Sequence, residues 1–478
     1  MSQVKKELLR GVFYTALAKY AGIVVHLIVT AVLARLLTPE DFGVVAIAVV
    51  IINFFSMLSD MGIGPAIIQK KDLSQKDLSH IFALTMYIGL FLSVSFFAAS
   101  GAFAELYKNA SLKSVIQLFS LSIFFHCVDI VPSNLLKRDK KFKFIAHCNV
   151  LVQVACGVVS IIAAFLNFGI YSLLIQPILG SAILFLINYI YRYVPFTFIV
   201  RLQSIKKIVS YSSYQFLFSF VNYFSRNLDK LVVGKTFSIT DLGYYEKSYR
   251  LMMLPVGNLS HVITPAIQPI FSEYQNDKNW LFSKSLNLFK VLILIGFPLT
   301  AFLFFASEEL VLIVFGSQWQ GAVPVFRILS LSIGVQIIYS PQGAFFQSAN
   351  AVKEMFFCGL ATAVLNIAAV FLGCMFFQSL TGLAWCIDFA YFCAFVIVYY
   401  VMIKVVFGKK FRSFLKIMVQ PTILALVVAL FLFAAEQMIH GVNGVFSLCV
   451  KGCVFALIML LYEIKYKTFR NYLSEKKK

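Results

Sequence analysis

The feature that most constrains this chain is a succession of apolar blocks, each about 20 residues long. A helix of that length crosses the roughly 30 Å of hydrocarbon in a bilayer. Backbone groups at that depth must satisfy one another, so only helices or a closed barrel can span the membrane. The blocks are continuous rather than alternating, which excludes barrel strands. The sequence therefore predicts an all-α, polytopic membrane protein.

The composition agrees with a membrane protein. Of the 478 residues, 60% are hydrophobic and 13% are charged, whereas about 25% of residues in an average soluble domain are charged. The net charge of +20 comes from basic residues in short loops, so we attribute it to topology and anionic lipids rather than to nucleic acid. Nine cysteines, with no CxxC pair, lie mostly within apolar blocks. We read them as buried hydrophobes and expect no metal and no cofactor.

We place fourteen membrane-spanning helices on the chain. Their expected ranges are 11–34, 42–66, 80–103, 112–132, 145–166, 169–191, 209–233, 243–268, 286–306, 322–346, 355–377, 381–403, 417–436 and 444–463. One further apolar run, Leu310–Phe315, is too short to cross a bilayer. We expect this run to lie at the membrane interface, with Trp319 as an anchor among the lipid headgroups.

Lysine and arginine residues gather in alternate loops. The loop between the fourth and fifth spans is an example, with Lys137, Arg138, Lys140, Lys141 and Lys143. The next loop, 167–169, has no basic residue. Because basic loops stay in the cytoplasm, this alternation predicts that both termini are cytoplasmic.

A shift of 200 residues brings two parts of the sequence into register. It places Arg35 on Lys235, Asp41 on Asp241, Gly43 on Gly243, Pro65 on Pro265 and Asp77 on Asp277. The repeat unit is six helices, which predicts two pseudo-symmetric six-helix lobes around a central cavity, a design suited to alternating access. We therefore divide the chain into an N-lobe (1–200, helices 1–6), a C-lobe (201–404, helices 7–12), and helices 13 and 14 with a cytoplasmic tail (405–478).

Three stretches carry a resemblance to a known family. They are 35–72, with RLLTPEDFG and LSDMGIGPAIIQKKD; 227–245, with NLDKLVVG and DLGYY; and 314–319, VFGSQW. They resemble bacterial polysaccharide transporters, the Wzx-like O-antigen flippases of the multidrug/oligosaccharidyl-lipid/polysaccharide superfamily. The resemblance covers about the first 400 residues, and the last two helices match only in hydropathy.

The resemblance implies a transporter rather than an enzyme, in the bacterial cytoplasmic (inner) membrane. Its substrate would be an undecaprenyl-pyrophosphate-linked oligosaccharide repeat unit of O-antigen, capsule or exopolysaccharide, moved from the cytoplasmic to the periplasmic or outer leaflet. Polymerase and glycosyltransferases of the same pathway are the implied partners, besides membrane lipids. The alternative is a MATE-like drug or metabolite antiporter of the same superfamily.

Charged and polar residues inside predicted spans are candidates for function, since each charge at that depth costs roughly 2.5–3.5 kcal/mol. The candidates for substrate binding in a cavity are Lys19, Asn222, Arg226, Lys247, Arg250 and Arg327. Lys19 is predicted near the midplane, where it either attracts the pyrophosphate or an acidic sugar, or forms a structural ion pair.

A second group of charges is assigned to ion coupling or to structural ion pairs. It consists of Asp229, Lys230, Glu246 and Asp388. An ion-pair network that joins helices 7 and 8 is the alternative to substrate binding by Arg226 and Arg250. It would consist of Arg226, Asp229 and Lys230 with Glu246, Lys247 and Arg250. Asp388 is either a carboxylate for a coupling ion, H⁺ or Na⁺, or a partly solvated residue bonded to a neighbouring helix.

Overall fold

The structure is a computed structural model of the chain. It describes residues 3–60, 63–70, 72–201, 223, 227–439 and 441–466. These residues form helices joined by short loops, with no strand among them, so the all-α prediction is confirmed for the described part. The chain divides into two compact units, Met1–Gly243 and Tyr244–Lys478. This division does not test the predicted boundaries at 200 and 404, which stay predictions.

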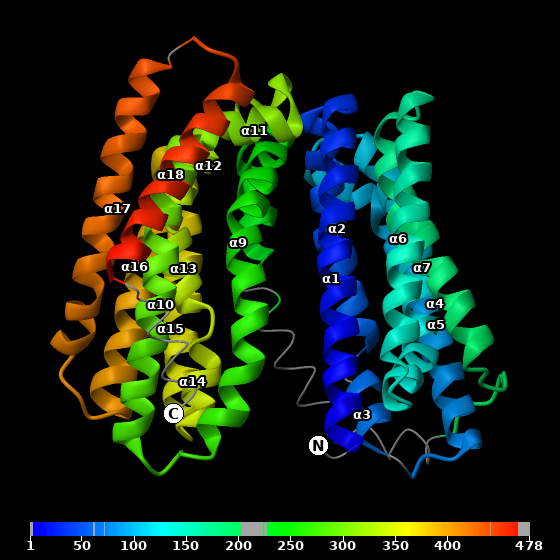
Figure 1. The fold of residues 1–478 in the computed structure, drawn as a ribbon. Coiled ribbons are helices and arrows are strands. Elements are labelled where there is room, and N and C mark those ends of the chain that lie inside the picture. Colours follow the sequence, from blue (N-terminus) through cyan, green and yellow to red (C-terminus); the bar gives the residue numbers. More distant parts are fainter. Residues whose placement is uncertain are drawn as a thin grey trace. The chain divides into compact units, whose positions relative to one another are not determined.

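The first unit is a bundle of long helices that stand side by side (Figure 1). Its elements are α1 (Gln3–Leu36), α2 (Pro39–Asp60), α3 (Ile63–Gln69), α4 (Gln75–Leu106), α5 (Ser111–Arg138), α6 (Phe142–Phe165), η1 (Gly169–Tyr171), α7 (Ser172–Tyr191) and the start of α9 (Ile239–Ser272). Within it, α4 and α7 pack on α5, and α1 packs on α6.

The second unit contains most of α9 and all later helices. These are α10 (Lys278–Phe305), α11 (Ser307–Phe315), η2 (Ser317–Trp319), α12 (Ala322–Ser330), α13 (Ile333–Tyr339), α14 (Gln342–Ser348), α15 (Val352–Leu372), η3 (Gly373–Phe377), α16 (Leu380–Tyr400), η4 (Val401–Val406), α17 (Arg412–Met438) and α18 (Gly444–Tyr466). Here α10 packs on α17 and α13, and α15 packs on α16.

Eleven of the described helices are long and apolar enough to cross a membrane, and the count rises to twelve if α12 and the following α13–α14 segment form one span. The predicted count of fourteen is not confirmed. The span expected at 209–233 lies largely outside the described residues, and α9, which covers the span expected at 243–268, is not among the eleven. The protein is nevertheless a multi-pass membrane protein.

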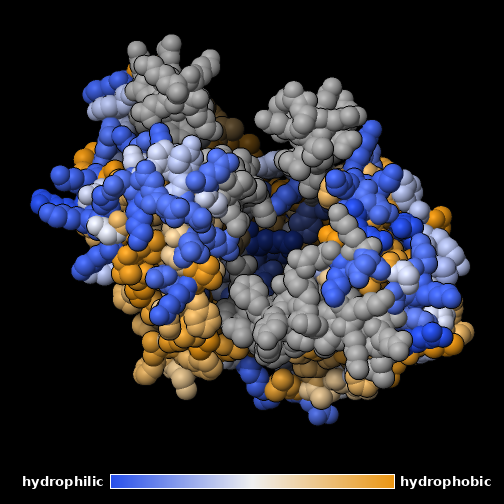
Figure 2. All heavy atoms as spheres, turned by 90° about the horizontal axis from the view of Figure 1, so that it is seen from below, coloured by the Kyte–Doolittle hydropathy of each residue, from blue (hydrophilic) through white to orange (hydrophobic). Residues whose placement is uncertain are grey.

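The surface agrees with a membrane environment. The side chains of Leu90, Phe91, Val94 and Phe97 on α4 are 51–70% exposed, a pattern that lipid explains and water does not. Figure 2 looks at the lower ends of the helices and shows hydrophilic side chains there in blue, with hydrophobic side chains in orange along the flanks.

The span expected at 322–346 is the clearest departure from the sequence prediction. It is divided into α12, α13 and α14, and the chain bends by 50° between α12 and the segment that follows it. At the first break, Leu331 N–H donates to Ile328 O and Ser332 N–H donates to Leu329 O, so the α-helical ladder is replaced by tighter i→i−3 bonds.

The short apolar run predicted at the interface forms α11, which is followed directly by η2. Gly316, which ends α11, has φ 103° and ψ 169°, a conformation that residues with a Cβ avoid. The turn directs Trp319 inward, where its side chain is fully buried. The prediction that Trp319 anchors among lipid headgroups is therefore wrong.

The 200-residue repeat appears in the structure as two equivalent helix starts. In α2, the Thr38 hydroxyl and N–H both donate to Asp41 Oδ2, at 2.7 and 2.9 Å, and Asp41 N–H donates back to the hydroxyl. In α9, Ser238 and Asp241 make the same three bonds. Each is a capping box, which satisfies amides that a helix start leaves without partners.

The repeat also produces a reciprocal contact within the first unit. A Cβ added to Gly43 would lie 1.9 Å from the carbonyl oxygen of Ile239, and a Cβ added to Gly243 would lie 2.1 Å from that of Pro39. Pro39 and Ile239 are themselves 200 positions apart. The two helix starts therefore approach one another so closely that only glycine fits at either position.

Candidate translocation site

Lys19 lies on α1 and its side chain is exposed. The helix is held to α6 nearby, where Gln153 Nε2 donates to the carbonyl oxygen of Gly22 at 2.9 Å. No carboxylate of the described residues lies within 4.0 Å of the Lys19 ammonium, so a structural ion pair of Lys19 has no partner among them. Because an ammonium among acyl chains is costly, the exposed position favours a hydrated surface.

The candidates on the seventh predicted helix are only partly described. Asn222 and Arg226 lie outside the described residues, and Asp229 and Lys230 are half-buried in the helical residues 227–236. Near Asp229, the carbonyl oxygen of Leu231 accepts a bond of 3.3 Å from the Tyr107 hydroxyl.

Lys235, the partner of Arg35 in the repeat, ties the same helical residues to the end of α4. Its ammonium donates to the carbonyl oxygen of Leu106 at 2.6 Å. A cation at the C-terminal end of a helix satisfies an orphan carbonyl and matches the helix dipole. The helical residues 227–236 are thus fixed to α4 within the first unit.

The candidate residues near the start of α9 differ in how far their side chains are exposed. Lys247 is 2% exposed, with its ammonium 5.6 Å from the Phe315 ring centre and 5.8 Å from that of Trp319. Glu246 is half-buried, while Arg250 is exposed. Aromatic faces stabilise a desolvated cation. In this structure the Arg250 side chain is therefore accessible from the surface, and the Lys247 side chain is not.

The contact between α9 and η2 explains the VFGSQW stretch in physical terms. Besides the rings over Lys247, Tyr244 lies edge-on to Trp319 with ring centres 6.1 Å apart. The Ser248 hydroxyl donates to the carbonyl oxygen of Ala322, three residues after the stretch, at 2.9 Å. These residues therefore build the packing that encloses Lys247.

Arg327 on α12 is held by the start of α11. Its Nε donates to the Ser307 hydroxyl at 2.9 Å, and its Nη2 lies 3.9 Å from a Glu308 carboxylate oxygen. The guanidinium also lies 5.9 Å from the ring centre of Phe304. The charge of Arg327 thus has a carboxylate partner in this structure, although its role in substrate binding stays a prediction.

Asp388 on α16 is the most enclosed of the candidate acids. Its side chain is 2% exposed, and neither carboxylate oxygen has a hydrogen-bond partner among the described residues. α16 packs against α12 and α13. Ser332, at the break between them, lies beside Asp388, but its hydroxyl donates to the carbonyl oxygen of Leu329 at 2.8 Å. Acidic residues inside membrane segments form proton relays in pumps and transporters, and interrupted helices coordinate ions through their free backbone carbonyls.

Sequence reasoning missed a buried ion pair in the second unit. Lys451 on α18, with a side chain 3% exposed, donates to Glu309 Oε1 at 2.5 Å and to the carbonyl oxygen of Phe305 at 2.7 Å. The Ser447 hydroxyl donates to the same carboxylate at 2.6 Å. A lysine in the middle of the span expected at 444–463 was the available signal.

Glu309 belongs to α11, which is not one of the spanning helices. Burial alone would raise the pKa of its carboxyl, but the hydrogen bonds from Lys451 and Ser447 outweigh burial and lower the pKa below its usual range. The carboxylate form is therefore held by its neighbours.

The first unit has a second missed pair, between α5 and α7. Asn188 Nδ2 donates to both carboxylate oxygens of Asp129, at 2.9 and 3.2 Å. Asp129 is the only carboxylate in the span expected at 112–132, and Asn188 lies in the span expected at 169–191. Asp129 therefore differs from Asp388 in having a described partner.

Comparison with known proteins identifies relatives that match between 72% and 96% of this chain. The lipopolysaccharide biosynthesis protein WzxC of Escherichia coli (strain K12) is 25% identical over 92% of this chain and 89% of its own. The succinoglycan biosynthesis transport protein ExoT of Rhizobium meliloti (strain 1021) is 25% identical over 96% and 94%. The teichuronic acid biosynthesis protein TuaB of Bacillus subtilis (strain 168) is 23% identical over 72% of each chain.

Solved structures define the fold. The lipid II flippase MurJ in an inward closed conformation aligns with a TM-score of 0.77 at 17% identity, over 96% of this chain and 99% of its own. An inward-facing MATE-family multidrug transporter of the MOP superfamily aligns with a TM-score of 0.62 at 13% identity, over 79% and 92%. The family model described as polysaccharide biosynthesis protein matches residues 32–324. This match covers more than half of the sequence, and the chain belongs to the polysaccharide biosynthesis protein family.

Proposed function

We propose that this protein is a flippase that moves undecaprenyl-pyrophosphate-linked oligosaccharide repeat units across the bacterial cytoplasmic membrane. The repeat units are those of O-antigen, capsule or exopolysaccharide, delivered to the periplasmic or outer leaflet. The observation that carries the proposal is the similarity over 96% of the chain to a polysaccharide transport protein, together with family membership. The fold shared with a lipid II flippase over the same share of the chain supports it.

The proposed topology has fourteen spanning helices in two six-helix lobes, with two further helices after them and both termini in the cytoplasm. The equivalent caps at Thr38–Asp41 and Ser238–Asp241 support the internal repeat on which this topology rests. The eleven or twelve candidate spans among the described residues are consistent with a polytopic helical protein, although they do not give the count of fourteen. Parallel repeats of this type suit alternating access to a site near the midplane.

The proposed mechanism is movement without covalent chemistry, so the protein is a transporter and not an enzyme. Lys19 and Arg250, both exposed, supply positive charge for the pyrophosphate, while the polyprenyl chain stays in lipid. No cofactor is needed, and an H⁺ or Na⁺ gradient supplies the driving force, with Asp388 as the coupling carboxylate. Glycosyltransferases that make the substrate and a polymerase that consumes it are the proposed partners.

A MATE-like antiporter is the second candidate. The similarity to a multidrug transporter of the superfamily favours it, but that match covers 79% of this chain, against 96% for the lipid II flippase.

Reconstitution tests the proposal and separates the two candidates. Purified protein in vesicles is given a lipid-linked oligosaccharide, and access of an added glycosidase to the sugar is followed with time. We expect protein-dependent exposure of the sugar on the opposite face. Export of cationic drugs without movement of the lipid-linked sugar would instead support the antiporter.

A further inference from the structure

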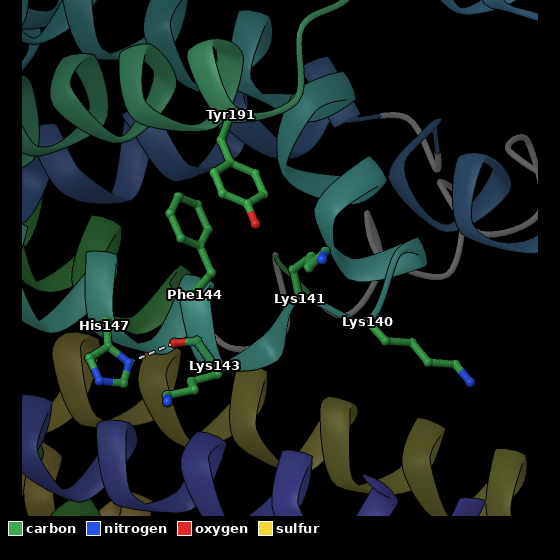
Figure 3. Close-up of a pocket in the computed structure, with 6 residues that line it drawn as sticks. All are labelled: Lys140, Lys141, Lys143, Phe144, His147 and Tyr191. Carbon is green, nitrogen blue, oxygen red and sulfur yellow. Dashed lines mark hydrogen bonds between the residues drawn. The ribbon is translucent and has the colours of Figure 1, made fainter.

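A hollow of about 390 Å³ lies at the lower end of the first unit, apart from every residue assigned above to translocation. It is lined by Lys140, Lys141, Lys143, Phe144, His147 and Tyr191 (Figure 3). We propose that this hollow binds the phosphate group of a lipid whose hydrocarbon chain lies against α6. The proposal rests on charge, on the aromatic wall and on the apolar surface next to it.

Two lysines of the hollow, Lys140 and Lys141, have no described acid beside them. Asp139, the acid next to the lysines in sequence, is paired instead with Arg192, whose Nε lies 2.9 Å from Asp139 Oδ2. No carboxylate of the described residues lies within 4.0 Å of Lys140 or Lys141. Basic pockets between membrane helices on the cytoplasmic side are suited to phosphorylated headgroups.

The start of α6 adds backbone donors to the same place. Lys141 is the N-cap of α6 and makes no side-chain capping bond. The first amides of a 24-residue helix then point outward together with the positive end of its dipole. Phosphate binds readily at such a helix start, and three lysines, Lys140, Lys141 and Lys143, lie at or next to this one in sequence.

Two aromatic rings form a wall and join α6 to α7. The ring centres of Phe144 and Tyr191 are 4.0 Å apart and the planes are inclined by 25°. Figure 3 shows the Tyr191 hydroxyl on the side of Lys141, and His147 turned to the carbonyl of Lys143, with which its Nδ1 makes a 2.7 Å bond. Amphipathic rings at headgroup level are typical of a membrane interface.

An apolar surface continues from the hollow along α6. Leu151, Val154 and Val158 follow at i, i+3 and i+7 and therefore share one face, and their side chains are 67%, 40% and 50% exposed. On α7, Ile190 beside the aromatic wall is 77% exposed. A site with cations and a hydroxyl at one end and an apolar strip at the other fits a lipid better than free phosphate.

Two kinds of lipid have both a negatively charged phosphate group and a long hydrocarbon chain. One is an anionic phospholipid of the bilayer, and the other, which rests on the proposed function, is the polyprenyl pyrophosphate of the substrate. The test compares K140Q/K141Q with K409Q/K410Q, which removes two adjacent lysines from the other unit. Binding of fluorescent phosphatidylglycerol and of fluorescent polyprenyl pyrophosphate is measured separately on protein in zwitterionic nanodiscs.

We expect K140Q/K141Q to weaken binding roughly 30-fold, since each basic residue near a lipid surface contributes about 1 kcal/mol. The control pair should leave binding unchanged, and Y191A should also weaken it. Weakened pyrophosphate binding with unchanged phospholipid binding assigns the hollow to the substrate, and the reverse assigns it to a bilayer lipid. Wild-type binding of both lipids by K140Q/K141Q and Y191A, or equal losses in the control pair, would overturn the proposal. Because the readout is binding, it does not depend on transport.

Discussion

Gly43 and Gly243 occupy equivalent places in one reciprocal contact, each with its missing Cβ directed at a backbone carbonyl oxygen of the other helix start. Distances of 1.9 and 2.1 Å leave no room for a methyl group, and a backbone oxygen has no alternative rotamer. The conformation described above therefore requires glycine at both positions.

We expect Gly43→Ala and Gly243→Ala each to reduce transport at least about tenfold, because neither variant can form the reciprocal contact and one state of the cycle is lost. Both proteins should still reach the membrane, since the helices themselves tolerate alanine. Transport in vesicles is the measurement. Gly101→Ala is the control, because an added Cβ there meets nothing within 4 Å. Wild-type transport by both variants would show that the contact is not part of the cycle.

The two capping boxes predict equal energetic effects at two places far apart in sequence. Thr38→Ala and Ser238→Ala each remove the hydroxyl that accepts from an amide and donates to Asp41 or Asp241. Each should lower the free energy of unfolding by about 1 kcal/mol. Thermal unfolding in detergent measures the change, and Thr38→Ser, which keeps the hydroxyl, should match the wild type. A loss at only one site would contradict the structural equivalence of the two helix starts.

The buried pair of Lys451 and Glu309 predicts a large effect from a single substitution. Lys451→Met leaves the Glu309 carboxylate buried without its cation, which costs about 3–5 kcal/mol. The double variant with Glu309→Gln should recover most of that loss. Midpoints of thermal unfolding for the two single variants and the double variant give the coupling directly, and additive losses would argue against the pair.

The same pair predicts a dependence on pH. Its neighbours lower the pKa of the folded Glu309 carboxyl, so its contribution to stability is present above the unfolded pKa and is lost as the pH falls through the folded pKa. In Lys451→Met the main group that lowers this pKa is absent. Acidification should therefore narrow the difference in unfolding midpoint between this variant and the wild type. A difference that stays constant with pH would contradict the assignment.

Two aspartates inside membrane helices should behave differently on neutralisation. Asp388→Asn should abolish the dependence of transport on an H⁺ or Na⁺ gradient while leaving the unfolding midpoint almost unchanged, because its carboxylate has no described hydrogen-bond partner to lose. Asp129→Asn should instead disturb the bonds from Asn188 and lower stability, with gradient dependence retained. Gradient-dependent transport by Asp388→Asn at the wild-type rate would remove Asp388 from coupling.

The exposed candidate cations predict loss of transport without loss of stability. Lys19→Ala and Arg250→Gln should each abolish or strongly reduce surface polysaccharide at normal protein level, because both side chains are exposed in the structure. Immunoblots for protein and for polysaccharide measure the two quantities in one strain. Normal polysaccharide in Lys19→Ala would remove Lys19 from the mechanism.

Much of the fold followed from the sequence, since a bilayer imposes a fixed length and forces the backbone into helices. The repeat could also be predicted, because Asp41 and Asp241 cap their helices through neighbours three residues away. The breaks in α12–α14 could not, since hydropathy is the same for one straight span and for three short helices.

The candidate site was less predictable, because burial depends on residues far away in the chain. Glu246 and Arg250 are four residues apart and therefore share one helix face. The rings that cover Lys247, however, belong to Phe315 and Trp319, about 70 residues later. The partner of Lys451 is likewise more than 100 residues away. No local pattern contains such contacts.

The division of residues 322–348 into α12, α13 and α14 leaves this segment with two breaks, one of them bent by 50°. A change in angle between two of these short helices disturbs only the few backbone hydrogen bonds that cross the break. The hydrogen bonds within each short helix stay intact. At these breaks the second unit can therefore bend with the loss of fewer backbone hydrogen bonds than a continuous helix would lose. Asp388 lies beside Ser332 at the first of these breaks. A change in the charge of Asp388 would therefore act on the backbone at a point where few hydrogen bonds oppose a change in angle.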